Sequence, residues 1–464
     1  MSFIGIDLGT SFIKGAVLNL DAQRLEHIRR IPFPSRLKLA NPLLCEFDPN
    51  EVATAARMIL DDLVPYTSQC EGVVMCSQMH GMVLMNEHGE ALSNCISWMD
   101  HRGTMPHPSG SGSYFDALIR RTYPEQRAQL GNELCLERPA SFLFWLSEQG
   151  MLEPGLIPVS MPDFVVSALC GSVTAVEMTN ASASGLFNVE SLDWHHGVIE
   201  DLGLGSLRFP EIRNIGEAVG YSKFGARQVP WYTPIGDFQC ALLGALLNAE
   251  ELSLNISTGA QVSRLTTVLK PGNYQTRPSF EGSFLNTFSD IPGGRSLNVL
   301  VNILGELAAA QTISDDSKDP WIFIAQAARG VLDTDLKIDL SSSDKPEGAQ
   351  GMISNIREDN FTVGHLFRAS FKEMAEVYHT NACRLWPERA WKNIVFSGGV
   401  ASKLGVLRET IQKRFDTEYR LCPFVEDTLY GLLILASVFS GRAKSFRNFL
   451  NRLRSGLAED ASAK

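Results

Sequence analysis

The first strand of the chain ends in a turn whose residues could bind phosphate. Residues 4–8 alternate apolar side chains with small or acidic ones, in the two-residue period of a β-strand, and the turn 9–11 leads into a second apolar stretch. Small residues at this turn let backbone N–H groups and two hydroxyls approach phosphate oxygens, and the acid before the turn could hold a hydrated magnesium ion. A hairpin of this kind is also common without any ligand, so its role depends on the other motifs. The candidate phosphate and metal residues are Asp7, Gly9, Thr10, Ser11 and Lys14.

Two further segments could bind the rest of a nucleotide. Residues 252–266 form a strand, a Ser-Thr-Gly turn and a second strand, which repeats the first hairpin and predicts a duplicated lobe. Residues 393–396 form a short strand that meets a Gly-Gly turn, and we expect a helix to follow with Ser402 as its N-cap. Two glycines at such a turn permit close backbone approach to a flat ligand such as adenosine. The residues concerned are Thr258, Gly259, Gly398 and Gly399.

Polar clusters follow two of the predicted strands. Residues 77–81 (Ser-Gln-Met-His-Gly) come directly after a buried strand over 72–76, and residues 98–102 (Trp-Met-Asp-His-Arg) follow an apolar strand end. Side chains at the carboxyl end of a strand in an α/β sheet face the ligand crevice. Asp163 lies at the start of a predicted helix, where it could either bind a ligand or cap the helix.

The remaining elements that must position these clusters are those of an α/β protein. After the first hairpin we expect a third strand over 25–31 and a helix over 49–63, which Asp48 caps and Pro49 begins. Residues 103–113 are rich in Gly, Pro and Ser, which predicts a surface loop or flap. The other expected helical segments cover 114–150, 162–170 and 240–247.

The composition favours a folded enzyme over a nucleic-acid-binding or membrane protein. The 464 residues suffice for about three domains or for a two-lobed α/β enzyme. The net charge of −11, without a basic stripe, argues against a nucleic-acid partner. The longest apolar run, residues 429–439, is too short to cross about 30 Å of hydrocarbon and predicts a buried helix, so we expect no membrane partner.

The cysteines and the chain ends favour a cytoplasmic protein. Nine cysteines are an odd number and include no C-x-x-C pair, which favours reduced thiols over disulfides or zinc. The first strand begins at once, without a basic or apolar signal segment, so we expect no export. Residues 455–464 predict a solvated tail.

Taken together, six short motifs resemble the FGGY family of carbohydrate kinases in their order and spacing, over nearly the whole chain. The motifs cover residues 5–10, 77–81, 98–102, 236–237, 257–259 and 397–399. The resemblance implies a two-lobed, ribonuclease-H-like α/β fold of the actin-like ATPase type, with a cleft between duplicated lobes. It also implies an N-terminal sugar-binding lobe over 1–242, a C-terminal nucleotide-binding lobe over 243–454 and a flexible tail over 455–464.

Within this family, the chain is most similar to the sedoheptulokinases. Phe238 contributes to this similarity, because xylulose- and glycerol-directed relatives usually place Asn or Gln directly after the catalytic Asp. A polar contact to the sugar is therefore missing or supplied elsewhere. Glu177 stands where relatives commonly have Asp, and His101 stands where many have Gly. The stretches that carry the similarity are 77–81, 163–171, 180–188 and 254–258.

The resemblance also implies a role for each candidate residue. Asp237 would be the general base that takes the proton of the attacking sugar hydroxyl, although an Asp at this position could also only cap a helix. Mg²⁺-ATP would be the phosphoryl donor, with the ion near Asp7 and Asp237, and lobe closure would exclude water. Asp100 and Arg102 could reach sugar hydroxyls or orient one another. The implied sugar-binding residues are Gln78, Met79, His80, Trp98, Asp100, Arg102 and Asp163.

The sequence therefore predicts ATP-dependent phosphorylation of a ketose, with sedoheptulose converted to sedoheptulose 7-phosphate as the first choice. Xylulose or another polyol is the alternative acceptor within the same family. A nucleotide-gated binding protein of the actin or chaperone type is the alternative from another class, because such proteins share the phosphate hairpins and the Gly-Gly turn. The polar clusters at 77–81 and 98–102 favour the kinase. The sequence leaves the oligomeric state open, with a homodimer as one option.

Overall fold

The computed structural model describes residues 1–67, 69–171, 175–310, 319–340 and 351–462. By their internal contacts, the residues group into two compact units. The first unit contains Met1–Leu246, Thr267–Phe284 and Pro423–Lys464, and the second contains Leu247–Thr266 and Leu285–Cys422. The division into lobes over 1–242 and 243–454 and a tail over 455–464 stays a prediction. Helix α15 (Phe446–Ser462) includes most of the residues of that predicted tail.

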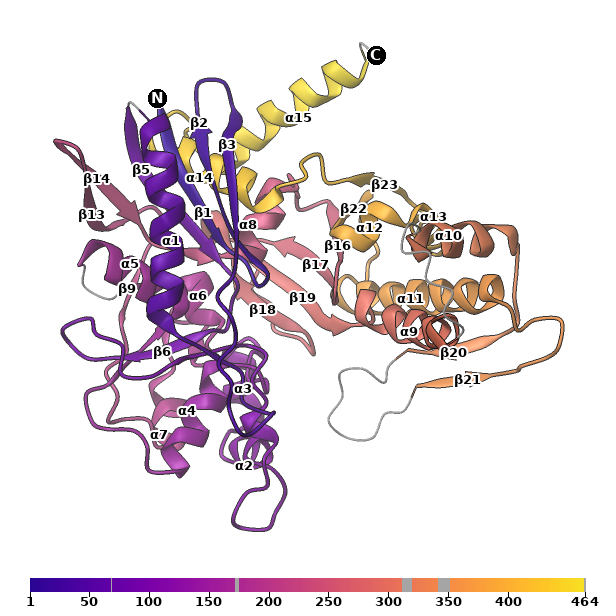
Figure 1. The fold of residues 1–464 in the computed structure, drawn as a ribbon, viewed down its shortest axis with the longest axis horizontal. Helices are drawn as coiled ribbons and strands as arrows, with labels where there is room; N and C mark the ends of the chain where they lie inside the picture. The colour runs from indigo at the N-terminus through magenta and orange to yellow at the C-terminus, as the bar shows by residue number, and fades with distance from the viewer. Residues whose placement is uncertain (68, 172–174, 311–318, 341–350, 463–464) are drawn as a thin grey trace. The chain divides into compact units, whose positions relative to one another are not determined.

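The first unit is built on one large mixed sheet (Figure 1). The predicted hairpin forms: β1 and β2 pair antiparallel, with Asp7 opposite Lys14, and β1 also pairs in parallel with β5. The third strand expected over 25–31 is confirmed as β3. The sheet has the strand order β13-β14-β5-β1-β2-β3, and β15 also pairs with β5. The strands are β1 (Ser2–Leu8), β2 (Phe12–Asn19), β3 (Arg24–Pro32), β5 (Cys70–Ser77), β13 (Ala218–Phe224), β14 (Arg227–Tyr232) and β15 (Ile235–Gly236).

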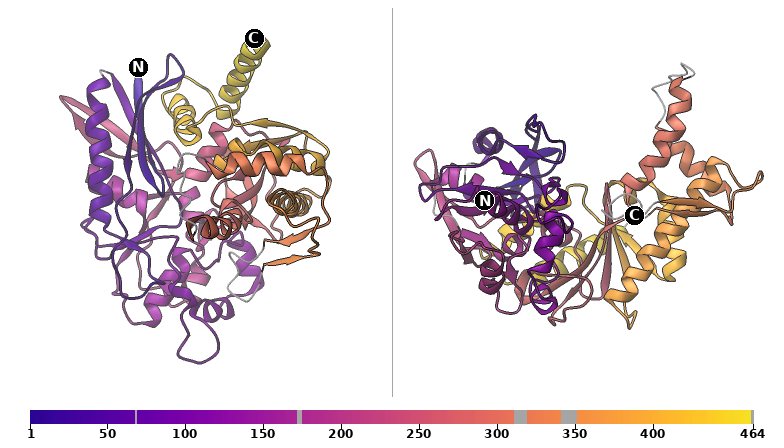
Figure 2. Two further views of the ribbon diagram at one scale, coloured as in Figure 1. Left: turned by 45° about the vertical axis from the view of Figure 1, so that its right-hand side comes forward. Right: turned by 90° about the horizontal axis from the view of Figure 1, so that it is seen from below.

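Helices cover both faces of this sheet because successive side chains of a strand point to opposite sides. Ile4, Ile6 and Leu8 of β1 pack in one apolar cluster with α1 (Pro49–Leu63), and Phe3 packs in another with α8 (Asp237–Gly244) and α14 (Asp427–Phe439). Helix α1 lies along the strands in Figure 1 and in the left view of Figure 2. Its predicted range is confirmed, and the Asp48 side chain accepts a hydrogen bond from the backbone N–H of Asn50. The buried helix predicted at 429–439 is α14.

The first unit also has a second part, and most of its elements follow β5 in the chain. Its sheet has the order β4-β7-β6-β8, and two further strand pairs are β9 with β12 and β10 with β11. The strands are β4 (Glu46–Phe47), β6 (Met82–Met85), β7 (Cys95–Ile96), β8 (Ile157–Ser160), β9 (Ala175–Glu177), β10 (Phe187–Asn188), β11 (Asp193–Trp194) and β12 (Glu211–Arg213). The helices are α2 (Tyr114–Arg120), α3 (Pro124–Gln129), α4 (Pro139–Glu148), α5 (Met161–Cys170), α6 (Met178–Ser182) and α7 (His196–Asp201). The helical pattern predicted over 114–150 is therefore divided among three helices.

The second unit repeats the strand arrangement of the first. Strands β16 and β17 form an antiparallel hairpin, and β16 also pairs in parallel with β22, as β1 does with β2 and β5. The order β19-β17-β16-β22 matches the order β3-β2-β1-β5, with β23 beside β22. The strands are β16 (Glu251–Ile256), β17 (Ala260–Thr266), β19 (Phe284–Ile291), β20 (Lys337–Asp339), β21 (Met352–Ser354), β22 (Asn393–Ser397) and β23 (Glu418–Leu421). The helices are α9 (Gly294–Ala310), α10 (Pro320–Gly330), α11 (Val363–Leu385), α12 (Gly399–Lys403) and α13 (Gly405–Phe415).

Several predicted boundaries are wrong. The helix after the Gly-Gly turn begins at Gly399, and the hydroxyl of Ser402 donates a hydrogen bond to the Gly398 carbonyl from inside α12, so Ser402 is not an N-cap. The helix predicted over 240–247 is α8, which begins three residues earlier, at Asp237. The predicted loop 103–113 begins with a short 3-10 turn, η2 (Arg102–Thr104), and an isolated bridge pairs Pro106 with Ser113.

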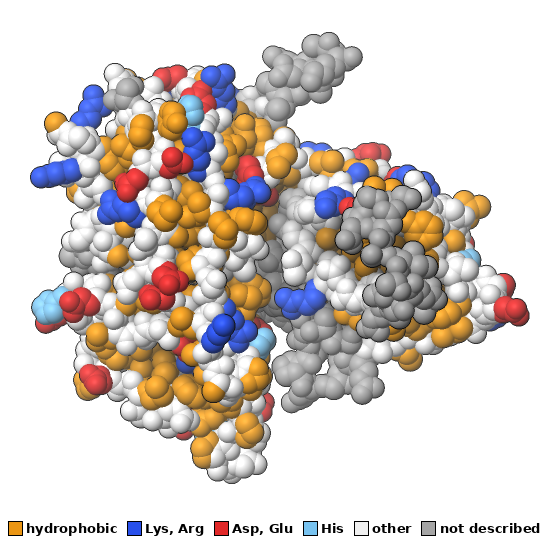
Figure 3. All heavy atoms as spheres, viewed as in Figure 1, with side chains coloured by type: hydrophobic (Ala, Val, Ile, Leu, Met, Phe, Trp, Pro, Cys, Tyr) orange, Lys and Arg blue, Asp and Glu red, His pale blue; other side chains and the backbone are white. Residues whose placement is uncertain are grey.

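Three further features concern the cysteines, the surface charges and the helix lengths. All nine cysteines are free thiols. On the face shown in Figure 3, basic and acidic side chains are interspersed over the described residues without a continuous basic stripe. A search of the described helices finds none with the length and apolar character that a membrane span needs.

Helices α8 and α14 meet at two glycines. A Cβ atom on Gly431 would lie 2.1 Å from the carbonyl oxygen of Cys240, and one on Gly244 would lie 1.9 Å from that of Asp427. We therefore expect Gly431→Ala to push the helices apart and to lower the free energy of unfolding by about 1–3 kcal/mol, as overpacking of a core does. Denaturant unfolding measures the loss. Gly197→Ala on α7 is the control, because its Cβ would meet no atom closer than 3.6 Å. Equal stability of the two variants would contradict the prediction.

Candidate active site

Asp7 lies at the end of β1, on the face of the sheet that α8 and α14 cover. It is 3% exposed, and its Oδ2 accepts a hydrogen bond of 2.7 Å from the hydroxyl of Thr428 at the start of α14. Its Oδ1 is buried and has no hydrogen-bond partner among the described residues. Burial raises the pKa of Asp7, and the nearby Lys14 opposes this. A buried carboxylate with an unused oxygen fits a site that binds a cation or a proton donor.

Asp237 is the first residue of α8, directly after β15. Gly236 occupies the N-cap position of this helix, so the alternative that Asp237 is only a helix cap is not the arrangement observed. Burial, with a smaller contribution from the negative charge of Asp7, raises the pKa of Asp237 to about 8. Asp427, at the start of α14, adds to this effect, and its own pKa is raised to about 6, chiefly by burial. A carboxylate with a pKa near neutrality matches a general base.

The three acids Asp7, Asp237 and Asp427 fit a hydrated magnesium ion better than a directly bound one. Among the described residues, no group of three or more His, Cys, Asp or Glu side chains could hold a metal ion by direct contacts. Mg²⁺ keeps several of its water molecules and is commonly bound through one or two carboxylates together with substrate phosphates. The unused Oδ1 of Asp7 and the mutual repulsion of the acids are consistent with such an ion.

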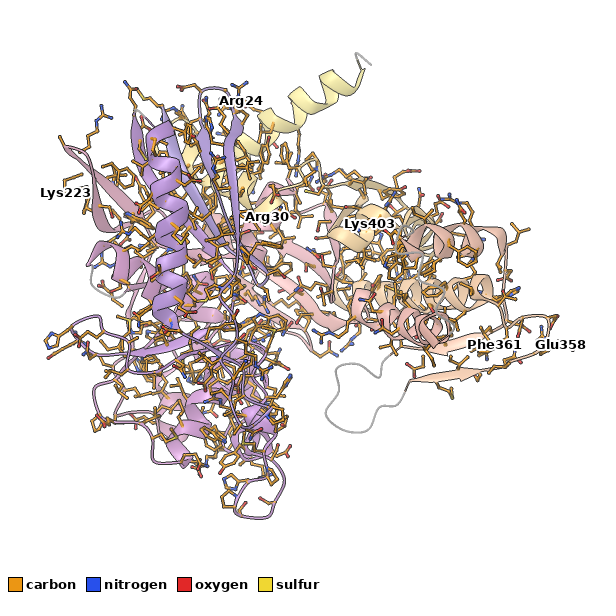
Figure 4. The ribbon with its side chains drawn as sticks, in the orientation of Figure 1. Arg24, Arg30, Lys223, Glu358, Phe361 and Lys403 are labelled. Atoms are coloured by element: carbon orange, nitrogen blue, oxygen red, sulfur yellow. The ribbon has the colours of Figure 1, made fainter. Side chains whose placement is uncertain are left out.

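Lys14 is paired with acids instead of being free for phosphate. Its Nζ lies 2.9 Å from Glu426 Oε2 and 3.7 Å from Asp7 Oδ2. Arg30 of β3, labelled in Figure 4, binds the other oxygen of Glu426 at 2.9 Å. A role of Lys14 at phosphate stays a prediction. The segment 426–428 was missed as part of the site, although its Glu-Asp-Thr run directly precedes the apolar helix.

Gln78 connects the predicted phosphate turn (residues 9–11) to Trp98, another of the predicted sugar-binding residues. Its Oε1 accepts hydrogen bonds from the Thr10 hydroxyl at 3.2 Å and from Trp98 Nε1 at 3.0 Å. Its Nε2 donates to the carbonyl of Gly9 at 3.5 Å. Thr10 and the adjacent Ser11 are exposed, and their hydroxyls and N–H groups are therefore accessible to a ligand. The structure thus brings together residues from three separate motifs of the sequence, the turn 9–11 and the clusters 77–81 and 98–102.

His80 is a partly buried histidine that directly follows Met79. Its backbone has a positive φ of 71°, which is unusual for a residue other than glycine, and its Nδ1 donates to the Ala183 carbonyl at 2.9 Å. Burial lowers the pKa of His80 well below its usual value, and the positive charges of Arg138 and Arg277 lower it further. Gln78 and His80, with Ser160 and Asn180, line a cavity of about 30 Å³. A cavity of that volume holds about one water molecule.

Asp100 and Arg102 are bonded to each other. Both are buried, at 0% and 2% exposed. Arg102 donates from Nε to Asp100 Oδ1 at 2.8 Å and from Nη2 to Asp100 Oδ2 at 2.9 Å, and Nη2 also binds Glu46 Oε1 at 2.6 Å. Of the two predicted roles, the structure shows the mutual orientation. A sugar contact by either side chain stays a prediction.

Asp163 is buried beside a second acid, Glu177. Ser160 is the N-cap of α5 and donates a hydrogen bond to Asp163 Oδ2, so Asp163 does not itself cap the helix. Its Oδ1 is buried without a hydrogen-bond partner among the described residues. Burial, with a smaller contribution from the charge of Glu177, raises the pKa of Asp163 to about 8. Burial likewise raises the pKa of Glu177 to about 7. A sugar contact by Asp163 stays a prediction.

The buried carboxyl of Asp163 predicts a pH-dependent stability. The unfolded chain loses this proton near pH 3.8 and the folded chain only near pH 8, so stability that is present below about pH 4 is lost as the pH rises to about 8. Asp163→Asn cannot ionise, and we expect its free energy of unfolding to fall less steeply over this range, by up to about 1.4 kcal/mol per pH unit. Denaturant unfolding at several pH values measures the slopes. An exposed control, Asp61→Asn, should keep the wild-type slope, and an identical slope for Asp163→Asn would contradict the expectation.

In the second unit, the predicted nucleotide residues gather where β16 and β22 end. Thr258 and Gly259 form an exposed turn, in which the Ser257 N–H donates to the Gly259 carbonyl at 2.9 Å. Gly398 has a φ of 89°, and a Cβ there would lie 2.5 Å from the Ile256 carbonyl oxygen, so the turn requires glycine. A Cβ on Gly399 would meet open space. Helix α12 follows, ending at Lys403, which Figure 4 labels.

A buried ion cluster near Asp237 was missed by the sequence analysis. Glu133 is 0% exposed and accepts hydrogen bonds from Arg138 Nε at 3.0 Å and from Arg277 Nε at 2.5 Å. Arg277 also lowers the pKa of Asp237, against the larger effect of burial. No local pattern identifies the pair, because 144 residues separate Glu133 from Arg277.

Comparison with known proteins relates the chain to sugar kinases. The family model described as the FGGY family of carbohydrate kinases, N-terminal domain, matches residues 2–244. Glycerol kinase 2 of Saccharolobus solfataricus is 22% identical over 312 residues, which cover 62% of this chain and 56% of that protein. Xylulose kinase of Staphylococcus epidermidis is 25% identical over 257 residues, covering 52% of this chain and 48% of that protein. The chain thus spans about half the length of the curated relatives it matches.

Solved structures match over nearly the whole chain. The xylulose kinase from Rhodospirillum rubrum is 17% identical, with 100% of this chain and 98% of that chain covered and a TM-score of 0.79. The Plasmodium falciparum glycerol kinase with ADP is 16% identical, with 98% and 92% covered and a TM-score of 0.79. The predicted fold class is confirmed: the chain has the two-lobed, ribonuclease-H-like α/β fold of these kinases.

Proposed function

Because the chain belongs to the FGGY family of carbohydrate kinases, we propose that it transfers the γ-phosphoryl group of ATP to a hydroxyl of a sugar. The observation that carries this proposal is the position of Asp237 at the start of α8. It is a carboxylate with a pKa raised by burial to about 8, beside Asp7 of the phosphate turn. Family membership argues against the alternative of a nucleotide-gated binding protein.

In the proposed reaction, Asp237 accepts the proton of the sugar hydroxyl as that oxygen attacks phosphorus. Asp7 and Asp237 would hold a hydrated Mg²⁺, which when bound neutralises charge on the nucleotide phosphates. Thr10 and Ser11 supply exposed hydroxyl and N–H donors to phosphate oxygens. Contacts of Thr258, Gly259, Gly398 and Gly399 with the nucleotide remain part of this proposal.

The proposed acceptor is a ketose, and sedoheptulose is the first candidate on the similarity of residues 77–81, 163–171, 180–188 and 254–258. Xylulose or another polyol is an equally supported alternative, because the relatives include xylulose and glycerol kinases. We also propose a cytoplasmic location, which the nine free thiols favour. A homodimer remains one option for the oligomeric state.

A coupled ADP-release assay tests the proposal. Wild-type protein with Mg²⁺-ATP is assayed against sedoheptulose, xylulose, glycerol and gluconate, and phosphorus NMR of the product identifies the phosphorylated position. Release that depends on a sugar supports the kinase, and the preferred acceptor decides between the candidates. Release that is independent of every sugar and unaffected by Asp237→Asn would overturn the proposal. Equal rates with xylulose and sedoheptulose would remove only the preference for sedoheptulose.

A further inference from the structure

Arg277 lies on β18 (Gln275–Pro278), in a part of the first unit that is fixed to the loop after α3. The N–H of Thr276 donates to the carbonyl of Gly131 at 2.8 Å. A Cβ on Gly131 would lie 2.1 Å from the Thr276 carbonyl oxygen, so this close approach requires glycine. Asn132 Nδ2 donates to the carbonyls of Gly272 and Tyr274, at 2.7 and 2.9 Å. The backbone before Arg277 is therefore held in place.

The guanidinium of Arg277 is held by a buried carboxylate that two arginines share. Arg277 is 2% exposed, and its Nε and Nη2 donate to the two oxygens of Glu133 at 2.5 and 3.3 Å. Arg138 donates to the same carboxylate at 3.0 Å. Burial raises the pKa of Glu133, but the two arginines outweigh this and hold it below its usual value. One carboxylate thus holds the guanidinium groups of both Arg138 and Arg277.

The remaining edge of Arg277 points toward Met79, one of the predicted sugar-binding residues, and toward Phe238, which follows the proposed base Asp237. Among the described residues, the hydrogen-bond partner of Nη1 is Met79 Sδ at 4.0 Å, and a thioether sulfur is a weak acceptor. The centre of the guanidinium lies 5.8 Å from the ring of Phe238. Met79 is flanked by Gln78 and His80, and Phe238 directly follows Asp237. A buried cationic donor edge without a strong acceptor is costly, unless a ligand supplies the acceptor.

We propose that the Nη1 edge of Arg277 donates hydrogen bonds to an oxygen of the sugar acceptor and so contributes to its specificity. This assignment rests on the proposed function. Phe238 offers no polar group next to Asp237, and Arg277, 5.8 Å from the Phe238 ring, supplies a polar contact there. A guanidinium carries several N–H donors and no acceptor, so it suits an acceptor molecule rich in oxygen atoms.

The alternative is that Arg277 is only part of a structural ion cluster, and Arg138 provides the matched comparison. Both arginines bind Glu133 and both are nearly buried, so Arg277→Met and Arg138→Met each leave Glu133 with one arginine. A structural role predicts the same loss of stability and the same kinetic change for both variants. A sugar contact predicts that the kinetic change belongs to Arg277→Met.

The test uses the acceptor that wild-type protein phosphorylates best among sedoheptulose, xylulose, glycerol and gluconate, together with its monodeoxy analogues. We expect Arg277→Met to raise the KM for this acceptor by about 10- to 100-fold, the range for loss of a hydrogen bond to a charged group, with the KM for ATP unchanged. Removing the hydroxyl that Arg277 contacts should weaken the wild type but have no further effect on Arg277→Met. Arg277→Lys keeps the charge and should fall between the two. Arg138→Met should keep the wild-type KM.

The outcomes separate this assignment from the proposed function. One outcome would overturn the assignment alone. In it, the wild type shows sugar-dependent turnover, while Arg277→Met keeps the wild-type acceptor KM and loses as much activity on the deoxy analogues as the wild type does. If Arg277→Met does not fold, Arg277→Lys takes its place: a wild-type acceptor KM and wild-type losses on the deoxy analogues in this variant would likewise overturn the assignment. Absence of sugar-dependent turnover in the wild type would overturn the proposed function and this assignment with it. Equal KM changes in Arg277→Met and Arg138→Met would identify a structural role and overturn the assignment.

Discussion

Asp237→Asn is expected to lower kcat for sugar phosphorylation by about 10²–10⁴, the usual contribution of general acid–base catalysis. The amide has nearly the shape of the carboxylate but cannot accept the proton of the sugar hydroxyl at neutral pH. The rates are compared at saturating Mg²⁺, because Asp237 is also a proposed ligand of the hydrated ion. Sugar-dependent ADP release measured at saturating sugar and ATP gives the ratio of kcat values.

The variant should remain folded, and this makes the kinetic result interpretable. Burial raises the pKa of Asp237 to about 8, which means that the folded protein disfavours the ionised carboxylate. A neutral amide at this position is therefore not expected to destabilise the fold. The exposed residue Asp193, on β11, provides a control, because Asp193→Asn should keep the wild-type kcat. A kcat for Asp237→Asn within the scatter of this control would exclude Asp237 as the base.

The sequence predicts those elements of the site whose signals lie within one continuous stretch of residues. The alternation of residues 4–8 specifies a strand with one face toward α1, and Asp48 and Pro49 specify where α1 begins. The repeat of this hairpin at 252–266 correctly predicts a second unit with the same strand order. In each case the signal is local, because period and capping depend on neighbouring residues.

The partners of the predicted residues could not be found in the same way. Thr428, which donates to Asp7, lies 421 residues away in the sequence, and Glu426, which binds Lys14, lies 412 residues away from it. Local periodicity identifies 429–439 as a buried helix but does not show that its first turn faces Asp7. The sequence also does not show which side chains are buried. It allows Asp100 and Arg102 to bind a sugar or each other, and the structure shows that both are buried and bonded to each other.

Asp7→Asn is expected to lower kcat/KM for Mg²⁺-ATP by about 10²–10³, similar to the loss of one group that stabilises charge in the transition state. The variant removes the carboxylate whose Oδ1 has no hydrogen-bond partner among the described residues, and with it one of the two proposed ligands of the hydrated ion. The Mg²⁺ concentration required for half-maximal rate should therefore rise. A titration of Mg²⁺ at fixed ATP measures this effect separately from the loss of rate.

The same variant should also change the pH dependence, in a direction that the charges determine. Deprotonation of Asp237 makes the base available, so the wild-type kcat/KM for the sugar should rise with pH and level off above about pH 8. The negative charge of Asp7 raises the pKa of Asp237, so its removal in Asp7→Asn lowers that pKa and moves the rising limb to lower pH. Lys14 would also lose one of its two acids and keep Glu426. A limb that stays in place or moves to higher pH would show that Asp7 and Asp237 are not coupled as the structure indicates.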